Sequence, residues 1–296
     1  MKKVGSFLVI ALIVIASTFA FSMIKPSHEI AQAASFMVGG DRPVFVDSPS
    51  GYSSNDPAPL LIDLHGYMGT SVSEARFAQL DTAAKKNHMI YAAPDGLTDA
   101  NGYEFWNASS ACCNFFKNPV DDAAYIDSLI DEISAKVDVD PKRIYVFGHS
   151  NGHFMTYKYA CTHSSRVAAI AGLAGAMDID PSTCKAKSPV NVLHIHGSAD
   201  EVVLPNGGYM GDVQYPSVKE TIAQWLAIDK CTAPAVMSSP FDLVTSIDGA
   251  ETTSTKYVCP DSTVELWSVA AGTHHPVLDS VFSQQVIDWL LAHPKK

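Results

Sequence analysis

Short apolar runs alternate with amphipathic stretches along most of the chain, and this pattern predicts its secondary structure. The predicted strands are residues 44–47, 60–64, 89–93, 144–147, 168–173, 190–195 and 264–269. The predicted helices are residues 73–86, 123–137, 154–161, 218–229 and 280–292. Strands that alternate with helices in this way require a mostly parallel central sheet with helices on both faces, which is an α/β architecture.

The segment GHSNG at residues 148–152 lies between a predicted strand and a predicted helix. G-x-S-x-G in this setting is typical of a nucleophile elbow, a tight turn that presents the serine hydroxyl above the sheet edge. Only small residues fit on either side of such a turn. Ser150 is therefore the candidate nucleophile, although the motif alone also fits a serine in an ordinary strand-to-helix turn.

An acid and a histidine follow Ser150 in the chain order that a nucleophile elbow requires. Asp200 lies in the loop after the predicted strand at residues 190–195, and His274 lies in the loop after residues 264–269. The order Ser, Asp, His differs from the orders of the two other common serine-hydrolase types. His274 would take the serine proton and return it to the leaving alcohol, while Asp200 would hold the imidazole in its productive tautomer.

Ester hydrolysis by such a triad also needs N–H groups that stabilise the negative charge of the tetrahedral intermediate. Asn151, directly after the serine, provides one backbone donor. The predicted strand at residues 60–64 ends in His65-Gly66, and the loop that follows can turn the next N–H group towards the elbow. The sequence therefore predicts an oxyanion hole formed by Tyr67 and Asn151.

The predicted substrate site is an open cleft. Only residues 176–188 lie between the strand after the elbow and the strand that carries the acid, which leaves no room for a large helical lid. An open cleft suits a chain end or side group of a polymer better than a buried lipid. Tyr67, Trp106 and His149 are the candidate substrate contacts, and packing beneath a long loop is the alternative role for Tyr67 and Trp106.

Several segments resemble secreted esterases of the α/β-hydrolase fold, grouped as polyhydroxybutyrate-depolymerase-like and feruloyl-esterase-like. The matching segments are PLLIDLHG at 59–66, PDG at 94–96, FWNA at 105–108, CC at 112–113, VDD at 120–122, VDPKR at 139–143, GHSNG at 148–152 and HGSAD at 196–200. This resemblance covers most of the chain from about Asp41 onward. It implies an α/β-hydrolase fold with no large lid domain, and one catalytic domain at residues 35–296.

Two positions depart from the pattern of the resembling family. His153 stands where the family usually has a second glycine after Ser-Asn-Gly, and this changes the floor of the pocket. The segment THHP at residues 273–276 replaces the usual Gly-His-x-Trp-Pro. His274 falls at the family position of the base, and His275 is the alternative.

The N-terminus has the pattern of a secretory signal peptide, with Met1-Lys2-Lys3 before an almost entirely apolar run at residues 7–21. We expect residues 1–34 to be a signal peptide and short leader, cleaved near 20–22 or 33–34, with an uncleaved membrane anchor as the alternative. The formal net charge of −11 and the lack of a basic patch argue against a nucleic-acid partner. No membrane partner is expected after cleavage, and the oligomeric state stays open.

Six cysteines in an exported protein predict three disulfides. Cys231 and Cys259 flank the segment before the last predicted strand and are expected to pair. Cys161 and Cys184 can close a second disulfide, which leaves Cys112 and Cys113 as a vicinal pair. The alternative is that these last four cysteines pair crosswise.

Metals and other cofactors are not expected. The cysteines lack C-x-x-C spacing, and His194 and His196 have no further ligands at a motif spacing. Alternation along a strand places these two histidines on one face, where we expect them to be packed and hydrogen-bonded. The glycine pairs of the chain also lack the strand–loop–helix context of a phosphate loop.

Together these features predict a secreted serine carboxylesterase that cleaves esters in or on a polymer through an acyl-enzyme. The substrate would be a feruloyl or acetyl ester of plant polysaccharide, or a hydroxyalkanoate polyester, since the triad chemistry is the same for each. The alternatives are a non-catalytic binding protein on a hydrolase scaffold and a peptidase on the same fold.

Overall fold

The computed structural model describes Met1 and residues 34–296. The predicted signal peptide and both predicted cleavage regions therefore lie almost wholly outside the described residues. Within the described part of the chain, no helix has the length and apolar character needed to cross a membrane.

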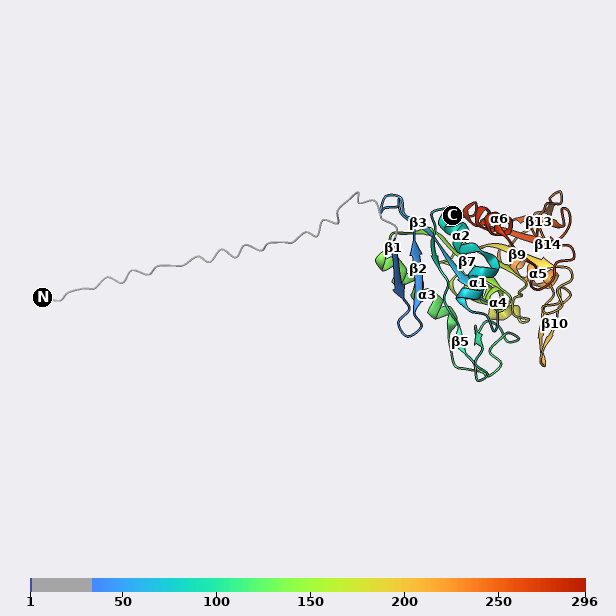
Figure 1. Ribbon diagram of the computed structural model, residues 1–296, viewed down its shortest axis with the longest axis horizontal. Helices are drawn as coiled ribbons and strands as arrows, with labels where there is room; N and C mark the ends of the chain where they lie inside the picture. The colour runs from blue at the N-terminus through green and yellow to red at the C-terminus, as the bar shows by residue number, and fades with distance from the viewer. Residues whose placement is uncertain (2–33) are drawn as a thin grey trace.

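Ten strands form one central sheet (Figure 1). They are β1 (Ala34–Val38), β2 (Val44–Ser48), β3 (Ala58–Leu64), β4 (Ile90–Ala92), β7 (Val139–His149), β8 (Ala169–Leu173), β9 (Asn191–Gly197), β12 (Val236–Met237), β13 (Thr252–Val258) and β14 (Thr263–Val269). Their order across the sheet is β1-β2-β4-β3-β7-β8-β9-β14-β13-β12. The strands from β4 to β14 in this order pair in parallel, and the strands at both edges pair antiparallel. Two short hairpins, β5 (Leu97–Thr98) with β6 (Glu104–Phe105) and β10 (Gly208–Met210) with β11 (Val213–Tyr215), lie outside this sheet.

Helices cover both faces of the sheet, which confirms the predicted α/β architecture. One face packs against α1 (Ser71–Ala78), α2 (Leu80–Lys86) and α6 (Ser280–Leu291), and the other against α3 (Asp122–Lys136), α4 (Asn151–His163) and α5 (Val218–Ile228). Each face has its own apolar core, because successive side chains of a strand point to opposite sides. In β3, for example, Leu60 and Ile62 join the core under α3 and α4, whereas Leu61 joins the core under α2 and α6.

The helix predicted at residues 73–86 is in fact two helices. Gln79 has a φ of 53°, which ends α1 and precedes α2. Ala78 and Leu80 are both buried in the same core, so the apolar pattern continues across the break. Apolar periodicity alone therefore did not reveal where the chain turns.

The edge strands β1, β12 and β13 were not predicted from the sequence. β13 has the sequence TTSTKYV, and only two of its seven residues are buried. An antiparallel edge region can leave one face in water, so its strands need few apolar residues. The sequence analysis depended on apolar runs and therefore detected the buried central strands but missed these.

Two of the three disulfides tie separate elements of the fold together. Cys161–Cys184 joins the end of α4 to the loop between β8 and β9, and Cys231–Cys259 joins the segment after α5 to the segment after β13. Cys112–Cys113 forms the third. The structure thus has the vicinal arrangement and not the crosswise one.

Candidate active site

Ser150 lies at the sharp turn between β7 and α4. Its φ of 53° is in the left-handed region, where non-glycine residues are uncommon. A Cβ atom on Gly148 would overlap the backbone of Gly152, and one on Gly152 would overlap the carbonyl group of Leu64. The close approach of β7, α4 and β3 therefore requires glycine on both sides of the serine, as in a nucleophile elbow.

Ser150, His274 and Asp200 form one hydrogen-bonded chain. His274 Nε2 lies 3.0 Å from Ser150 Oγ, and His274 Nδ1 lies 3.0 Å from each carboxylate oxygen of Asp200. The three residues follow the carboxyl ends of β7, β14 and β9, which run parallel in the same sheet. His274 and Asp200 are buried, whereas Ser150 is partly exposed, so a substrate can reach its hydroxyl.

The surroundings of Asp200 favour its ionised form. Burial by itself would raise the pKa of Asp200, but hydrogen bonds with His274 and with the backbone of Val202 and Val203 outweigh burial and place the pKa below its ordinary value. The two backbone N–H groups donate to Asp200 Oδ1 at 2.9 Å each. The carboxylate can therefore stabilise a positive charge on the His274 imidazole.

His275 differs from His274 in its position. It is exposed, and its ring packs edge-on against the rings of Phe77, His149 and His274. Both hydrogen bonds that a general base needs, one to the serine and one to the acid, are made by His274.

The loop after β3 runs directly beside the elbow. A Cβ on Gly66 would lie 3.3 Å from the Cβ of Ser150, which is tighter than most real contacts. Further along, Met68 N–H donates to the Glu104 carbonyl at 2.9 Å, and Gly69 N–H donates to the Gly66 carbonyl at 3.0 Å. These bonds fix the loop on either side of Tyr67, the predicted first oxyanion donor.

Asn151, the predicted second donor, is the first residue of α4. N–H groups in the first turn of a helix have no acceptor within the helix and are available to a ligand. The Asn151 side chain is held by Trp106, because Oδ1 accepts from Trp106 N–H at 2.7 Å and Nδ2 donates to the Trp106 carbonyl at 3.0 Å.

Trp106 and His149 require a correction to the sequence-based assignment of substrate contacts. The Trp106 side chain is fully buried, and its Nε1 donates to the His65 carbonyl at 3.0 Å. His149 is also buried, and its Nε2 donates to the His274 carbonyl at 3.0 Å. Both side chains therefore pack beneath the site and hold its loops, because neither is open to a substrate.

Tyr67 lies at the surface beside the elbow. Its ring is partly exposed and packs edge-on against Tyr103 and Phe115, which are both exposed. Its hydroxyl donates to Asp99 Oδ2 at 2.7 Å. Tyr67 thus remains a candidate substrate contact on an aromatic surface.

Sequence reasoning missed the residues that hold the Trp106 loop. Asp122, at the start of α3, accepts from Asn107 N–H and from Arg42 Nη1 at 2.8 Å each. Arg42 also donates to the backbone carbonyl of Asp95 at 2.8 Å. The signal was available, because the segments PDG, FWNA and VDD that contain these acids and Asn107 are all part of the family resemblance.

Among the described residues, two groups of side chains lie close enough to share a metal ion. In each, the ligand atoms lie within 4.8 Å of one another; the groups are His149, His274 and His275, and His65, Asp95 and Glu104. In the first, His149 and His274 already make the hydrogen bonds of the triad and its support, so a cation would compete with the triad. In the second, His65 Nε2 accepts from Gly96 N–H at 2.9 Å, and burial and Asp95 raise the pKa of Glu104 to about 7.

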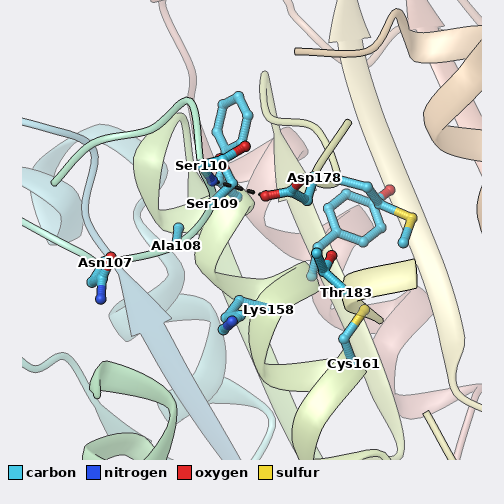
Figure 2. Close-up of a pocket in the computed structure, with 11 residues that line it drawn as sticks. Asn107, Ala108, Ser109, Ser110, Lys158, Cys161, Asp178 and Thr183 are labelled. Carbon is cyan, nitrogen blue, oxygen red and sulfur yellow. Dashed lines mark hydrogen bonds between the residues drawn. The ribbon is translucent and has the colours of Figure 1, made fainter. Parts of the chain in front are cut away.

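A cavity of about 250 Å³ lies along α4, next to the loop that follows Trp106 (Figure 2). Its walls include Phe154 and Lys158 from α4, and none of the three triad residues lines it. Ser110 N–H donates to Asp178 Oδ2 at 2.8 Å, a bond that joins the loop after β6 to the loop after β8 in Figure 2. The cavity is therefore separate from the Ser150–His274–Asp200 chain.

This sheet, with a serine elbow followed in sequence by an acid and a histidine, is the α/β-hydrolase fold. Residues 52–211, more than half of the chain, match the family described as Phospholipase/Carboxylesterase. The chain belongs to this family. The predicted fold, which lacks a large lid, is thereby confirmed.

Named relatives confirm the resemblance seen in the sequence. The chain is 32% identical over 207 residues to "Feruloyl esterase B" of Piromyces equi, covering 67% of this chain and 38% of that protein. It is 28% identical over 239 residues to "Poly(3-hydroxyalkanoate) depolymerase C" of Paucimonas lemoignei, covering 76% of this chain and 53% of that protein. The chain thus spans only about two fifths to one half of the length of these relatives.

Solved structures share the fold. An acetyl xylan esterase from Aspergillus awamori superimposes with a TM-score of 0.65 at 16% sequence identity, covering 88% of this chain and 99% of that chain. A phospholipase/carboxylesterase from Dyadobacter fermentans gives a TM-score of 0.54 at 15% identity, covering 88% and 98%. At such identities the likeness establishes the fold alone.

Proposed function

We propose that the protein is a carboxylic ester hydrolase in which Ser150 is the nucleophile, His274 the general base and Asp200 the acid that orients it. The observation that carries this proposal is the hydrogen-bonded chain from Ser150 Oγ through His274 to Asp200. Membership of the Phospholipase/Carboxylesterase family supports the same reaction class.

The reaction proceeds in two halves. Ser150 Oγ attacks the ester carbonyl carbon while its proton passes to His274 Nε2, and Asp200 stabilises the resulting imidazolium. The backbone N–H groups of Tyr67 and Asn151 donate to the oxyanion. His274 then gives the proton to the leaving alcohol, and an acyl group remains on Ser150. In the second half, His274 takes a proton from water while the water oxygen attacks the acyl carbonyl carbon. The bond from that carbon to Ser150 Oγ then breaks, His274 returns the proton to Ser150 Oγ, and the carboxylic acid leaves.

We place the substrate among esters in or on a polymer. The loop between β8 and β9 contains only the short helix η1 (Pro181–Thr183), so no lid encloses the serine. Among the described residues, a site without a large lid in this loop, beside the exposed rings of Tyr103 and Phe115, suits a side group or chain end that projects from a large molecule. The names of the relatives point to feruloyl or acetyl esters of plant polysaccharide and to hydroxyalkanoate polyester as the two substrate classes.

We further propose that the protein acts outside the cytoplasm. All six cysteines are in disulfides, and such bonds persist in oxidising compartments. This supports the secretion that the N-terminal sequence pattern predicts.

A release assay tests the proposed reaction. Purified protein and the Ser150→Ala variant are compared on methyl ferulate, acetylated xylan, short hydroxybutyrate oligomers and a peptide amide. We expect at least one ester to be cleaved at a rate at least about 10⁴-fold above that of the variant, with the amide left intact. Cleavage of the amide alone would indicate a peptidase. A folded protein that cleaves none of the four would support the non-catalytic alternative and contradict the proposal.

A further inference from the structure

Three buried histidines form a row behind the catalytic acid, and the proposed reaction steps do not use them. His153 lies in α4, and His194 and His196 lie on one face of β9. His153 Nε2 is 3.0 Å from His194 Nδ1, and His194 Nε2 is 3.2 Å from His196 Nδ1. Their exposed fractions are 0%, 0% and 4%. We call these three residues the histidine row.

One end of the histidine row touches the loop that carries Asp200. His196 Nε2 lies 2.8 Å from the carbonyl oxygen of Val203. The backbone N–H of Val203 donates to Asp200 Oδ1 at 2.9 Å. His196 Nε2 also lies 3.4 Å from Asp200 Oδ2. A shift of His196 would therefore move the acid relative to His274.

The Val203 carbonyl fixes the hydrogens of His196 and His194. A carbonyl can only accept, so His196 Nε2 must carry a hydrogen, and a neutral imidazole has only one N–H. His196 Nδ1 therefore accepts from His194 Nε2. Both histidines hold the Nε2–H tautomer and donate in one direction, towards Val203. His194 Nδ1 has one lone pair, and His153 Nε2 and the Tyr157 hydroxyl each lie 3.0 Å from it.

This ordering requires that the row carries no charge. A protonated imidazole has N–H on both nitrogens, so protonation of His196 would place its Nδ1–H against the Nε2–H of His194. Burial lowers the pKa of all three histidines, that of His153 to about 3. The neighbouring histidines lower these pKa values further, while the Val203 carbonyl and Asp200 act in the opposite direction on His196.

The fold provides a closely fitting space for His153. A Cβ on Gly172, in β8, would overlap the His153 ring, and one on Gly175 would lie 2.6 Å from the His153 Cβ. His153 Nδ1 also lies 2.9 Å from Thr156 Oγ1. The ring is thus held in one orientation, with Nε2 directed at His194.

We propose that His153, His194 and His196 are positioning residues that orient Asp200 through this proton-ordered, uncharged row. The inference rests on the proposed function, because it takes Asp200 as the acid of the triad. The effect on catalysis is indirect, since no hydrogen bond joins the three imidazoles to the Ser150 hydroxyl, and the one bond to Ser150 runs from the His153 backbone N–H to the Ser150 carbonyl at 2.8 Å.

Histidine NMR tests the row without reference to activity. Protein labelled with ¹⁵N in its histidines is recorded at neutral pH, and the signals are assigned by their loss in His153→Gln, His194→Gln and His196→Gln variants. We expect three neutral imidazoles, with His194 and His196 each in the Nε2–H tautomer. A mixture of tautomers or the Nδ1–H form at either of these two, or a protonated member of the row, would overturn the proposal.

Kinetics then test the positioning role with two variants of one residue. In His196→Gln the amide group can still donate near the Nε2 position, whereas His196→Leu has a similar volume and no donor. We expect Leu to lower kcat by about 100-fold with little change in KM, since small misplacements have effects of this size, and Gln to stay within about tenfold of wild type. His88→Gln, in an exposed loop, is the control. Equal kcat values for the Gln and Leu variants, or an effect on KM alone, would overturn the role.

The two proposals fail in different ways. If the wild-type protein hydrolyses no ester, the proposed function fails, and the NMR result on the tautomers is unaffected. If the wild-type protein is active but its row holds mixed tautomers, only the histidine row is wrong. Should His196→Leu not fold, the NMR result and the Gln variant still decide the question.

Discussion

At the scale of single residues, two adjacent histidines differ because the chain turns between them. The His274 ring is buried between Ser150 and Asp200, whereas the His275 ring lies at the surface over Phe77. General-base catalysis requires hydrogen-bond reach first and a suitable pKa second. Position therefore favours His274 as the base.

We expect His274→Ala to lower kcat/KM for ester hydrolysis by at least about 10³-fold, because triad members act as a unit. His275→Ala should lower it by less than about tenfold, since it removes only ring contacts. Steady-state kinetics on both variants, with thermal melts to confirm folding, check this ranking. If the two losses were reversed, His275 would be the base.

Sequence predicted which residues lie together at the proposed reaction centre better than which side chains around it face solvent. Ser150, Asp200 and His274 could be inferred because each follows a strand in a fixed order. Trp106 was assigned to the cleft because it lies in a motif-bearing loop, but a sequence does not show which side of a loop faces water. The sequence also placed His194 and His196 on one face of a strand, but it did not show their contact with His153, which is far from His194 in sequence and meets it only across packed elements.

At the scale of elements, β3 and α1 each contribute one buried carboxyl group next to the loop that follows β3. Burial raises the pKa of Asp63, in β3, to about 7, although a hydrogen bond from Tyr91 opposes this rise. Burial and Asp63 raise the pKa of Glu74, in α1, while the backbone of Gly66 lowers it. A group whose pKa is raised on folding adds stability at low pH and loses it as the pH rises through the folded-state pKa.

Asp63→Asn removes one of these titrations and keeps an oxygen that can accept from Tyr91. The unfolding free energy of the variant minus that of wild type should therefore be larger at pH 8 than at pH 5. We expect a gain of at least about 1 kcal/mol, since each unit of pKa shift corresponds to about 1.4 kcal/mol. Urea unfolding at the two pH values measures the change.

Asp261→Asn is the matched control, because the Asp261 side chain is 65% exposed. The difference between this variant and wild type should not change between the two pH values. If the unfolding free energy of Asp63→Asn minus that of wild type did not increase from pH 5 to pH 8, the prediction would be wrong. Asp63 would then be ionised in the folded protein throughout this range.

Central elements were easier to predict than edges. β3, β8, β9 and the part of β7 from Ile144 onward are buried on both faces, so their mostly apolar sequences predict them directly. β13 has polar residues facing water, and the break at Gln79 changes the backbone while the apolar pattern continues. The apolar pattern of a sequence indicates which residues are buried. It therefore predicts neither a mostly exposed edge strand nor a turn between two buried helices.

At the scale of the whole molecule, a disulfide supports the side of the sheet that carries the base. Cys231–Cys259 joins the segment after α5 to the segment after β13. β14 follows directly, pairs with both β13 and β9, and leads into the loop of His274. Loosening this region would displace His274 before it disrupted the central core.

The Cys231→Ser/Cys259→Ser variant should be less stable by about 2–4 kcal/mol. Its activity should be lost at a lower temperature than its far-UV circular dichroism, because catalysis tolerates little misplacement. Parallel activity and dichroism melts measure both transitions. Coincident loss of the two signals would indicate that the disulfide supports only global stability.

The central claim is that Ser150 forms a covalent acyl-enzyme, and active-site labelling tests it most directly. The protein is incubated with an ester-like fluorophosphonate, digested, and mapped by mass spectrometry, with Ser150→Ala in parallel. We predict one adduct per chain, on the peptide that contains Ser150, with loss of esterase activity in step with labelling and no adduct on the variant. Full activity with Ser150 unlabelled, or labelling of another residue in step with inactivation, would contradict the account.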